Sequence, residues 1–359
     1  MRTTLSPPSR PIDRTSVTVV VPCYNYRRFL PQSIGSALSQ SGVQVDVIVV
    51  DDASQDGSAE YVRQLSRRDS RVQLLKHASN AGHIATYNDG LDRAQGDLVT
   101  VLSADDVLAD GSLGRAAALF EAEPSVGLVY GRAIRFNSEH PPVNLDTAIK
   151  WRIWKGHEWA GLVYSGGRNV MLSPEAVMRS RVQRIIGGYD PDQPHAGDLA
   201  MWLRASSESD IAHISGATQA FYREHGQNMH SEVYEADQAR GMVTDLRARR
   251  LAFENSSERH THSEFLLAEA RRSLSSEALD LASRAYVWGL TASWPVDELV
   301  AFALETDSCA SESRAWRAFS RRRCAGARFA RRNPAFLPRE RILGILDRWR
   351  SSRWLRTGL

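Results

Sequence analysis

Residues 16–22 read SVTVVVP, residues 45–50 read VDVIVV and residues 97–102 read DLVTVL. Each run is short, apolar and rich in β-branched residues, and a polar turn and a segment of helical spacing follow it. Residues 72–75 fit the same pattern. Apolar strands that alternate with amphipathic helices indicate a parallel sheet covered on both faces. The sequence therefore predicts an α/β fold from residue 16 to about residue 130.

The expected helices of this α/β part cover residues 27–40, 58–68, 84–94 and 112–121. Residues 131–225 are less regular, and we expect short helices there at 174–179 and 197–206. Beyond residue 232 the pattern is helical only, at residues 234–253, 263–273, 277–289, 296–304 and 341–349. The chain thus divides into a flexible leader (1–15), an α/β domain (16–230) and a helical C-terminal region (231–359).

Composition excludes several classes of protein. The chain of 359 residues is 42% hydrophobic and 24% charged with a net charge of +3, which is typical of a globular protein and not of a disordered or fibrous one. Three scattered cysteines form neither a disulfide framework nor a zinc motif, and no apolar run reaches membrane-spanning length. None of the three lysines stands in a phosphate-binding loop motif. We expect a cytoplasmic protein.

Acidic residues follow two of the predicted strands, Asp51-Asp52 after the second and Asp105-Asp106 after the last. The carboxyl ends of parallel strands meet at one edge of the sheet, where ligands bind. Carboxylates gathered there favour a divalent cation and a phosphate-bearing ligand; the alternative is that they cap helices. The glycine-rich dinucleotide fingerprint is absent, because no glycine follows the first strand before residue 35.

Four segments in this order carry a resemblance: VVVPCYNYRRFLPQSIGSALSQ (19–40), VIVVDDASQDGS (47–58), NAGHIATYNDGLDRAQGDLVTVLSADDVL (80–108) and HAGDLAMWLR (195–204). Together they resemble the family-2 inverting glycosyltransferases of the GT-A fold over residues 16–225. The resemblance implies a mixed, mostly parallel Rossmann-like sheet flanked by helices, to which an all-helical C-terminal appendage is added. It also makes residues 16–230 the nucleotide-sugar-binding and catalytic domain.

The resemblance implies roles for particular residues. Tyr24 would lie against the nucleotide base, with a core position at the strand end as the alternative. The Asp51 carboxylate would accept a hydrogen bond from the base, and the Asp105-Asp106 pair would hold the ribose and the metal-bound diphosphate. The ion would be Mn²⁺ or Mg²⁺ on Asp106, as in a DXD-like motif. The remaining matches are Pro22 and Asn80 in the nucleotide pocket, where a turn role for Asn80 is an alternative, and His225 as a metal ligand, where a structural role is the alternative.

Asp198 is the predicted catalytic base. It stands in the first turn of an expected helix, whose positive dipole end keeps a carboxylate ionised at neutral pH, and an ionised carboxylate can take a proton from an acceptor hydroxyl. The alternative is a helix-capping aspartate. Residues 166–169 and 173–175 occupy the region that lines the acceptor pocket in the family. Three tryptophans nearby offer either a sugar-stacking surface or core packing: Trp151, Trp154 and Trp159.

The predicted function is that of a metal-dependent, inverting hexosyltransferase that moves a sugar from a nucleoside diphosphate, UDP in preference, to an acceptor hydroxyl. A sugar-nucleotide pyrophosphorylase is an alternative, but it would need a glycine-rich loop after the first strand. A non-catalytic sugar-nucleotide-binding or scaffold protein is another alternative, and the presence of Asp198 beside the acidic pair counts against it.

Residues 314–356 contain 14 arginines and only two acidic residues. Within them, residues 341–349 have the spacing of a basic amphipathic helix. We expect such a helix to lie on an anionic membrane, as a peripheral contact, or against an acidic face of the protein itself. No nucleic-acid-binding motif accompanies the charge, so nucleic acid is not an expected partner.

Overall fold

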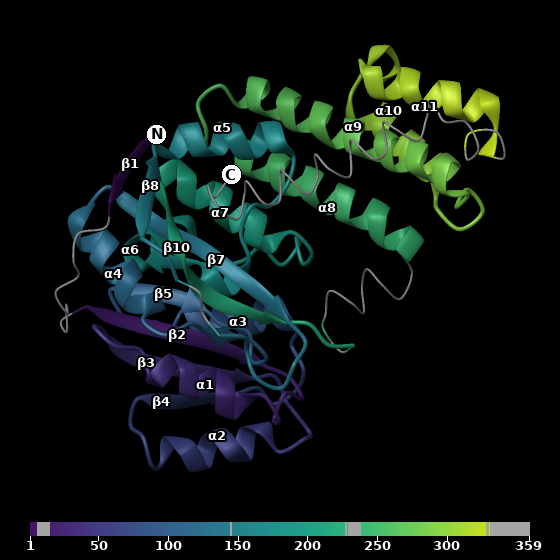
Figure 1. Cartoon of the computed structure of the whole chain (residues 1–359). Helices are drawn as coiled ribbons and strands as arrows, with labels where there is room; N and C mark the ends of the chain where they lie inside the picture. The colour runs from purple at the N-terminus through teal and green to yellow at the C-terminus, as the bar shows by residue number, and fades with distance from the viewer. Residues whose placement is uncertain (6–14, 144–145, 227, 229–237, 328–329, 331–359) are drawn as a thin grey trace. The chain divides into compact units, whose positions relative to one another are not determined.

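The computed structural model describes residues 1–5, 15–143, 146–226, 228, 238–327 and 330 (Figure 1). They form two compact units. The first contains the described residues of 1–160 and 169–224, and the second contains those of 161–168 and 225–354. Each unit is described below by itself.

A mixed sheet is the centre of the first unit. Its parallel half consists of the four predicted strands, β2 (Ser16–Cys23), β3 (Gln44–Asp51), β4 (Val72–Lys76) and β5 (Leu98–Val101). The other strands are β6 (Val107–Leu108), β7 (Val126–Phe136), β8 (Lys150–Trp154), β9 (Val177–Arg179) and β10 (Asp210–Arg223). With β1 (Arg2–Leu5) included, the strand order is β1-β8-β10-β7-β9-β5-β2-β3-β4, and β6 pairs with β10. The predicted α/β fold with a mixed sheet is confirmed.

The first residues of the chain are part of this sheet. Strand β1 (Arg2–Leu5) pairs antiparallel with β8, and Arg2 lies opposite Ile153. The expectation of a flexible leader is therefore wrong for residues 2–5, while residues 6–14 lie outside the described part. A strand of four residues has too short a pattern to be recognised, because its pairing partner lies about 150 residues away.

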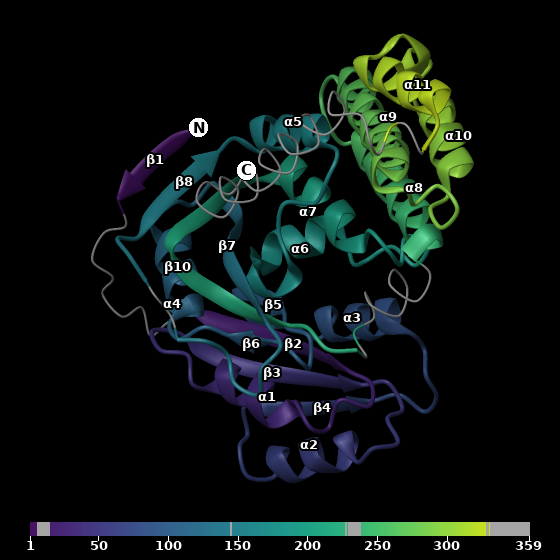
Figure 2. The ribbon, with the colours of Figure 1, turned by 45° about the vertical axis from the view of Figure 1, so that its right-hand side comes forward.

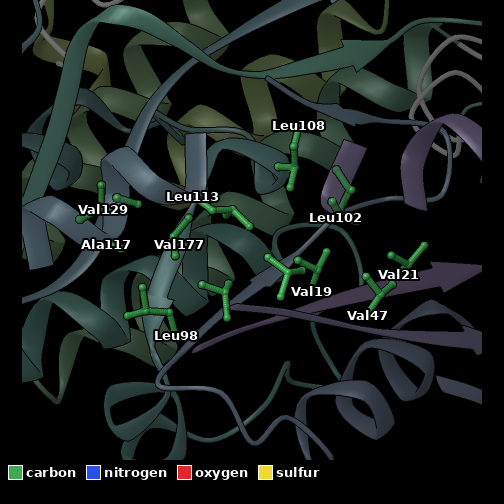
Figure 3. Packing of buried hydrophobic residues seen from close by; sticks show 14 of the residues in the cluster. Val19, Val21, Val47, Leu98, Leu102, Leu108, Leu113, Ala117, Val129 and Val177 are labelled. Atoms are coloured by element: carbon green, nitrogen blue, oxygen red, sulfur yellow. The ribbon is translucent and has the colours of Figure 1, made fainter. Parts of the chain in front are cut away.

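Helices cover both faces of the sheet (Figure 2). On one face, side chains from α1 (Leu30–Leu38), α2 (Ser58–Ser66) and α4 (Ser112–Ala122) join the core formed by alternate residues of β2 and β3. Figure 3 shows Val19, Val21, Val47 and Leu113 in this core. The other face carries α3 (His83–Leu91), α6 (Ser180–Ile186) and α7 (Gly197–Glu208).

The second unit is helical. It contains α8 (Gln238–Ser257), α9 (Ser263–Trp288), α10 (Val296–Thr306) and α11 (Arg314–Ala325), together with residues 161–168, where α5 (Gly156–Gly166) ends. The prediction of two helices at 263–273 and 277–289 is wrong, because α9 is continuous. Leu274 and Ala278 continue its buried stripe, and no glycine or proline interrupts it. The predicted helix at 341–349 lies outside the described residues.

Among the residues that the structure describes, no helix has both the length and the apolar character needed to cross a membrane.

The contact between α3 and the sheet depends on Gly90, and this gives a stability prediction. A Cβ atom at Gly90 would lie 2.2 Å from Cγ1 of Val20, so Gly90→Ala forces α3 away from β2. We expect the free energy of unfolding to fall by about 1–3 kcal/mol, as for other overpacked cores. Gly35→Ala is the matched control, since a Cβ there meets no atom within 4 Å, and alanine should stabilise α1 by about 0.5–1 kcal/mol. Equal denaturation midpoints for the two variants would contradict this account.

Candidate functional site

The loops that follow β2 and β3 are joined by hydrogen bonds. The backbone N–H of Asn25 donates to Oγ of Ser54 (2.9 Å), and the N–H of Gln55 donates to Oδ1 of Asn25 (2.8 Å). Asn25 adopts a left-handed backbone conformation with φ of 57°, which asparagine tolerates better than most residues. Tyr24 stands at this turn with 48% of its surface exposed. It is therefore not a core residue, and its ring is free to meet a ligand.

Asp51 ends β3 and is fully buried. Its Oδ2 accepts a hydrogen bond from the backbone N–H of Ser54 (3.2 Å), whereas Oδ1 has no hydrogen-bond partner. A buried acceptor without a partner costs free energy unless a ligand or water supplies a donor. Asp51 therefore offers one free acceptor at the carboxyl end of β3.

Asp52 stabilises the loop before α3. Its Oδ1 accepts the backbone N–H of Ala81 (2.7 Å), and its Oδ2 accepts that of Gly82 (3.0 Å). His77 lies between Asp52 and Asp89, with a ring nitrogen 2.8 Å from each carboxylate. Oδ1 of Asn80 also accepts the Gly82 N–H (3.1 Å). Asn80 thus has a turn role in the structure, and its contact with a nucleotide stays a prediction.

The acidic pair lies just after β5, and both of its side chains are buried. Oδ1 of Asp106 accepts the backbone N–H of Arg223 (2.9 Å), and Oδ2 has no partner. Burial, followed by the nearby charge of Asp105, raises the pKa of Asp106 well above its ordinary value. The Arg223 side chain donates from Nε to the backbone oxygen of Asp105 (2.9 Å) and contacts Gln32 of α1.

Arg223 is a residue of this region that no sequence pattern indicates. Its guanidinium also donates to the carbonyl oxygens of Ser138 (2.9 Å) and Glu139 (3.2 Å), so that one buried side chain joins three segments around the acidic pair. The arginine stands in the sequence segment FYREH (221–225), beside His225, but only the folded chain shows which atoms it contacts.

The negative charge of this region contributes to raised pKa values of two tyrosines. Burial and then the charges of Asp106 and Asp105 raise the pKa of Tyr222 to about 12. Burial also raises the pKa of Tyr87 in α3, and the charge of Asp198 contributes before those of Asp105 and Asp106. Tyr87 is therefore near all three carboxylates, and the fold brings the acidic pair and Asp198 to one region.

Asp198 stands in the first turn of α7, as predicted, and its carboxylate accepts two hydrogen bonds. Oγ of Ser173 donates to Oδ2 (2.5 Å), and the hydroxyl of Tyr189 donates to Oδ1 (2.9 Å). Burial raises the pKa of Asp198, and the hydrogen bonds from Ser173 and Tyr189 oppose that rise. The pKa of Asp198 is thus raised overall, whereas the helix dipole alone would lower it.

Ser173 lies next to a segment for which the predicted secondary structure is wrong. Residues 174–179 were predicted to be a helix, but Ser173–Glu175 form a single 3₁₀ turn and β9 follows. Glu175 is buried in this turn, where Oε1 accepts the N–H of Leu172 (2.8 Å) and burial raises the pKa to about 8. A turn that a buried side chain stabilises through a hydrogen bond to the backbone cannot be predicted from the spacing of apolar residues.

The remaining predicted residues divide between core and periphery. Trp151, Trp154 and Trp159 are buried, which excludes the sugar-stacking alternative and makes them core residues. Pro22 lies in β2 beside Val50 of β3. His225 begins the second unit, where its backbone N–H donates to Oδ1 of Asn228, and its role as a metal ligand stays a prediction.

Comparison with known proteins shows what the chain is similar to. Residues 18–179 match the model of Glycosyl transferase family 2. An uncharacterized glycosyltransferase of Haemophilus influenzae is 38% identical over 97 residues, which are 27% of this chain and 39% of that protein. The putative teichuronic acid biosynthesis glycosyltransferase TuaG of Bacillus subtilis is 36% identical over 90 residues, 25% of this chain and 36% of that protein. The chain thus matches well under half of the length of these relatives.

Two solved structures share the fold. S. aureus TarS 1-349, in complex with UDP-GlcNAc, has a TM-score of 0.60 at 16% identity over 88% of this chain and 89% of its own. The mannosyltransferase PcManGT from Pyrobaculum calidifontis, in complex with GDP-Man and Mn²⁺, has a TM-score of 0.52 at 17% identity over 89% of this chain and 87% of its own. The GT-A fold expected from the sequence is confirmed.

Proposed function

We propose that the chain is a metal-dependent inverting glycosyltransferase that moves a sugar from a UDP-sugar to an acceptor hydroxyl, with residues 16–230 as its catalytic domain. The observation that carries the proposal is the placement of Asp198. Its carboxylate accepts two hydroxyl hydrogen bonds, and Tyr87 lies near both it and the acidic pair. A base and a diphosphate site in one region are what sugar transfer requires.

The donor base is assigned to the loops after β2 and β3. Asp51 has a single free buried acceptor, Oδ1, which matches the single N–H donor on the pairing edge of uracil. Guanine presents two donors on that edge, and the second oxygen of Asp51 is occupied by Ser54. The exposed ring of Tyr24 offers a face for stacking. These features favour UDP over GDP.

The acidic pair fits a divalent metal. Asp106 has a buried carboxylate oxygen without a partner, and Mn²⁺ and Mg²⁺ prefer such oxygen ligands. Among the described residues, no group of three or more His, Cys, Asp or Glu side chains is arranged to hold a metal. Asp106 would be the ligand, with Asp105 beside it on the ribose. When bound, the metal would offset the negative charge of the diphosphate.

Asp198 is the proposed proton acceptor. The acceptor hydroxyl gives its proton to the carboxylate as its oxygen attacks the anomeric carbon, and the bond from that carbon to the diphosphate oxygen breaks. Attack from the face opposite the leaving group inverts the configuration. Burial raises the pKa of Asp198, and a carboxylate with a raised pKa that is still ionised is a stronger base.

The alternatives explain less of the site. A sugar-nucleotide pyrophosphorylase would require a glycine-rich loop after β2, and residues 24–29 contain no glycine. A binding or scaffold protein has no use for a carboxylate held by two hydroxyl groups. Neither alternative accounts for Asp198.

The first prediction of this proposal concerns Asp198→Asn. The amide cannot accept the proton, so we expect turnover to fall by roughly two to four orders of magnitude, while UDP affinity stays unchanged. UDP release from UDP-sugars with Mn²⁺ measures turnover, and calorimetry measures affinity. Asp92→Asn, at an exposed position after α3, is the matched control and should behave as the wild type. Full turnover in Asp198→Asn would remove this residue from the mechanism.

The second prediction concerns Asp106→Ala. Without this ligand the metal cannot bridge the protein and the diphosphate, so the variant should bind UDP equally weakly with and without Mn²⁺. Calorimetric titration of UDP at two Mn²⁺ concentrations tests this, with the wild type as reference. An unchanged Mn²⁺ dependence would contradict the metal assignment.

We also propose a peripheral contact with an anionic membrane through the second unit. Arg314, Arg317 and Arg321 form an exposed stripe on α11, while Ala318 and Phe319 face its core. Exposed arginines attract anionic lipid headgroups electrostatically. The full chain should co-sediment with vesicles containing anionic lipid at low salt, and replacement of the three arginines by glutamine should weaken this. Failure of the wild-type chain to bind such vesicles would overturn the proposal.

A further inference from the structure

Tyr189 lies in the loop between α6 and α7, and three independent features of the structure converge on it. The first is its hydroxyl, which donates to Oδ1 of Asp198 (2.9 Å). With Ser173 on Oδ2 (2.5 Å), both carboxylate oxygens of Asp198 are held, so the plane of the carboxylate is fixed. The Tyr189 side chain is buried, which makes this hydrogen bond difficult for water to replace.

The second feature is the side chain of Asn88 in α3. Its Nδ2 donates to the carbonyl oxygen of Tyr189 (2.8 Å), and its Oδ1 accepts the Tyr189 N–H (2.7 Å). One amide therefore satisfies both backbone groups of Tyr189. The neighbouring residue Tyr87 packs its ring against that of Tyr189, with the ring centroids 5.0 Å apart.

The third feature is the pair of glycines that leave space for this arrangement. A Cβ at Gly188 would lie 2.3 Å from Oδ1 of Asn88, and a Cβ at Gly197 would lie 3.0 Å from Cδ1 of Tyr189. Gly188 thus admits the Asn88 amide, and Gly197, directly before Asp198, admits the tyrosine ring. Both glycines are explained by the position of one tyrosine.

We propose that Tyr189 is a positioning residue for sugar transfer: fixed by Asn88, it orients the Asp198 carboxylate and keeps it ionised. The inference rests on the proposed function, and it says which residue sets the orientation and the ionisation of the proposed catalytic base, Asp198. Tyr189 itself contacts the base and not the reacting atoms.

Other charged and polar groups near Asp198 also influence its pKa. From α3, a charge on His83 favours the ionised carboxylate, and the buried Tyr87 lies near it. Arg204, on the same helix as Asp198, donates to the carbonyl oxygens of Ile186 and Gly188, next to Tyr189. Ser173 donates from the 3₁₀ turn. Removal of the Tyr189 hydroxyl leaves these groups in place.

The test is Tyr189→Phe, which removes one oxygen. Loss of a donor to a carboxylate disfavours its ionised form, so the pKa of Asp198 should rise and the acidic limb of the kcat profile should move to higher pH. A hydrogen bond to a charged group is strong enough to move this limb by about one pH unit, or about tenfold in kcat on the limb. The KM for the UDP-sugar should not change, and kcat should recover toward the wild-type value at high pH.

Asn88→Ala gives a second route to the same result. It leaves the Tyr189 hydroxyl present but unfixed, so the limb should move in the same direction by a smaller amount. Tyr164→Phe is the matched control: it removes a buried hydroxyl that donates to the carbonyl oxygen of Phe253 in the second unit, and its pH profile should be that of the wild type.

The outcomes separate this inference from the proposed function. If Asp198→Asn is inactive and Tyr189→Phe keeps the wild-type pH profile, the positioning role is wrong and the proposed function stands. A loss of kcat that is equal at all pH values, with the limb unmoved, also overturns the inference, because it indicates a merely structural tyrosine. If Asp198→Asn is fully active, the proposed function itself fails at its base.

Discussion

The burial of four carboxylates at the carboxyl edge of the parallel strands is the constraint on which the rest of the first unit depends. An ionised carboxylate loses several kcal/mol of hydration when it is buried, unless donors replace the water. Asp52 receives two backbone N–H groups from the loop at Ala81 and Gly82, and one oxygen of Asp106 receives that of Arg223. Two oxygens, one on Asp51 and one on Asp106, have no partner. These two oxygens are the carboxylate atoms of this edge that still need a partner. A ligand that brings one hydrogen-bond donor and one cation would supply both partners.

Helix α3 connects these requirements. Asp52 fixes the start of the helix through the backbone of Gly82. Tyr87, in the middle of the helix, lies near the carboxylates of Asp105, Asp106 and Asp198. Asn88 forms hydrogen bonds with the backbone of Tyr189. Near its end, Gly90 brings the helix close against the sheet. A short helix of nine residues therefore sets the position of both the acidic edge of the sheet and the surroundings of Asp198, since a shift of its axis would move all of these contacts together.

The sequence predicts the parts of this arrangement that depend on local pattern. The strands β2 to β5 are recognisable because each is a mainly apolar run, and Asp51 and Asp106 are recognisable because acidic residues stand at the end of β3 and shortly after β5. Tyr189 and Arg223 could not be assigned in the same way, because Asn88 and Tyr189 are 101 residues apart and Asp106 and Arg223 are 117 apart. Such contacts exist only after the strands have taken their order in the sheet.

The two influences on Asp198 explain why its surroundings are built from hydroxyl groups. Burial raises the pKa and so favours the neutral carboxyl group, which cannot take a proton. A cationic partner would have the opposite effect, because it would hold the pKa low and weaken the base. Neutral donors from Ser173 and Tyr189 lie between these limits, since they favour the ionised form without adding a full charge. For the base role proposed for Asp198, a carboxylate that is ionised yet basic at neutral pH is therefore better served by two hydroxyl groups than by one arginine.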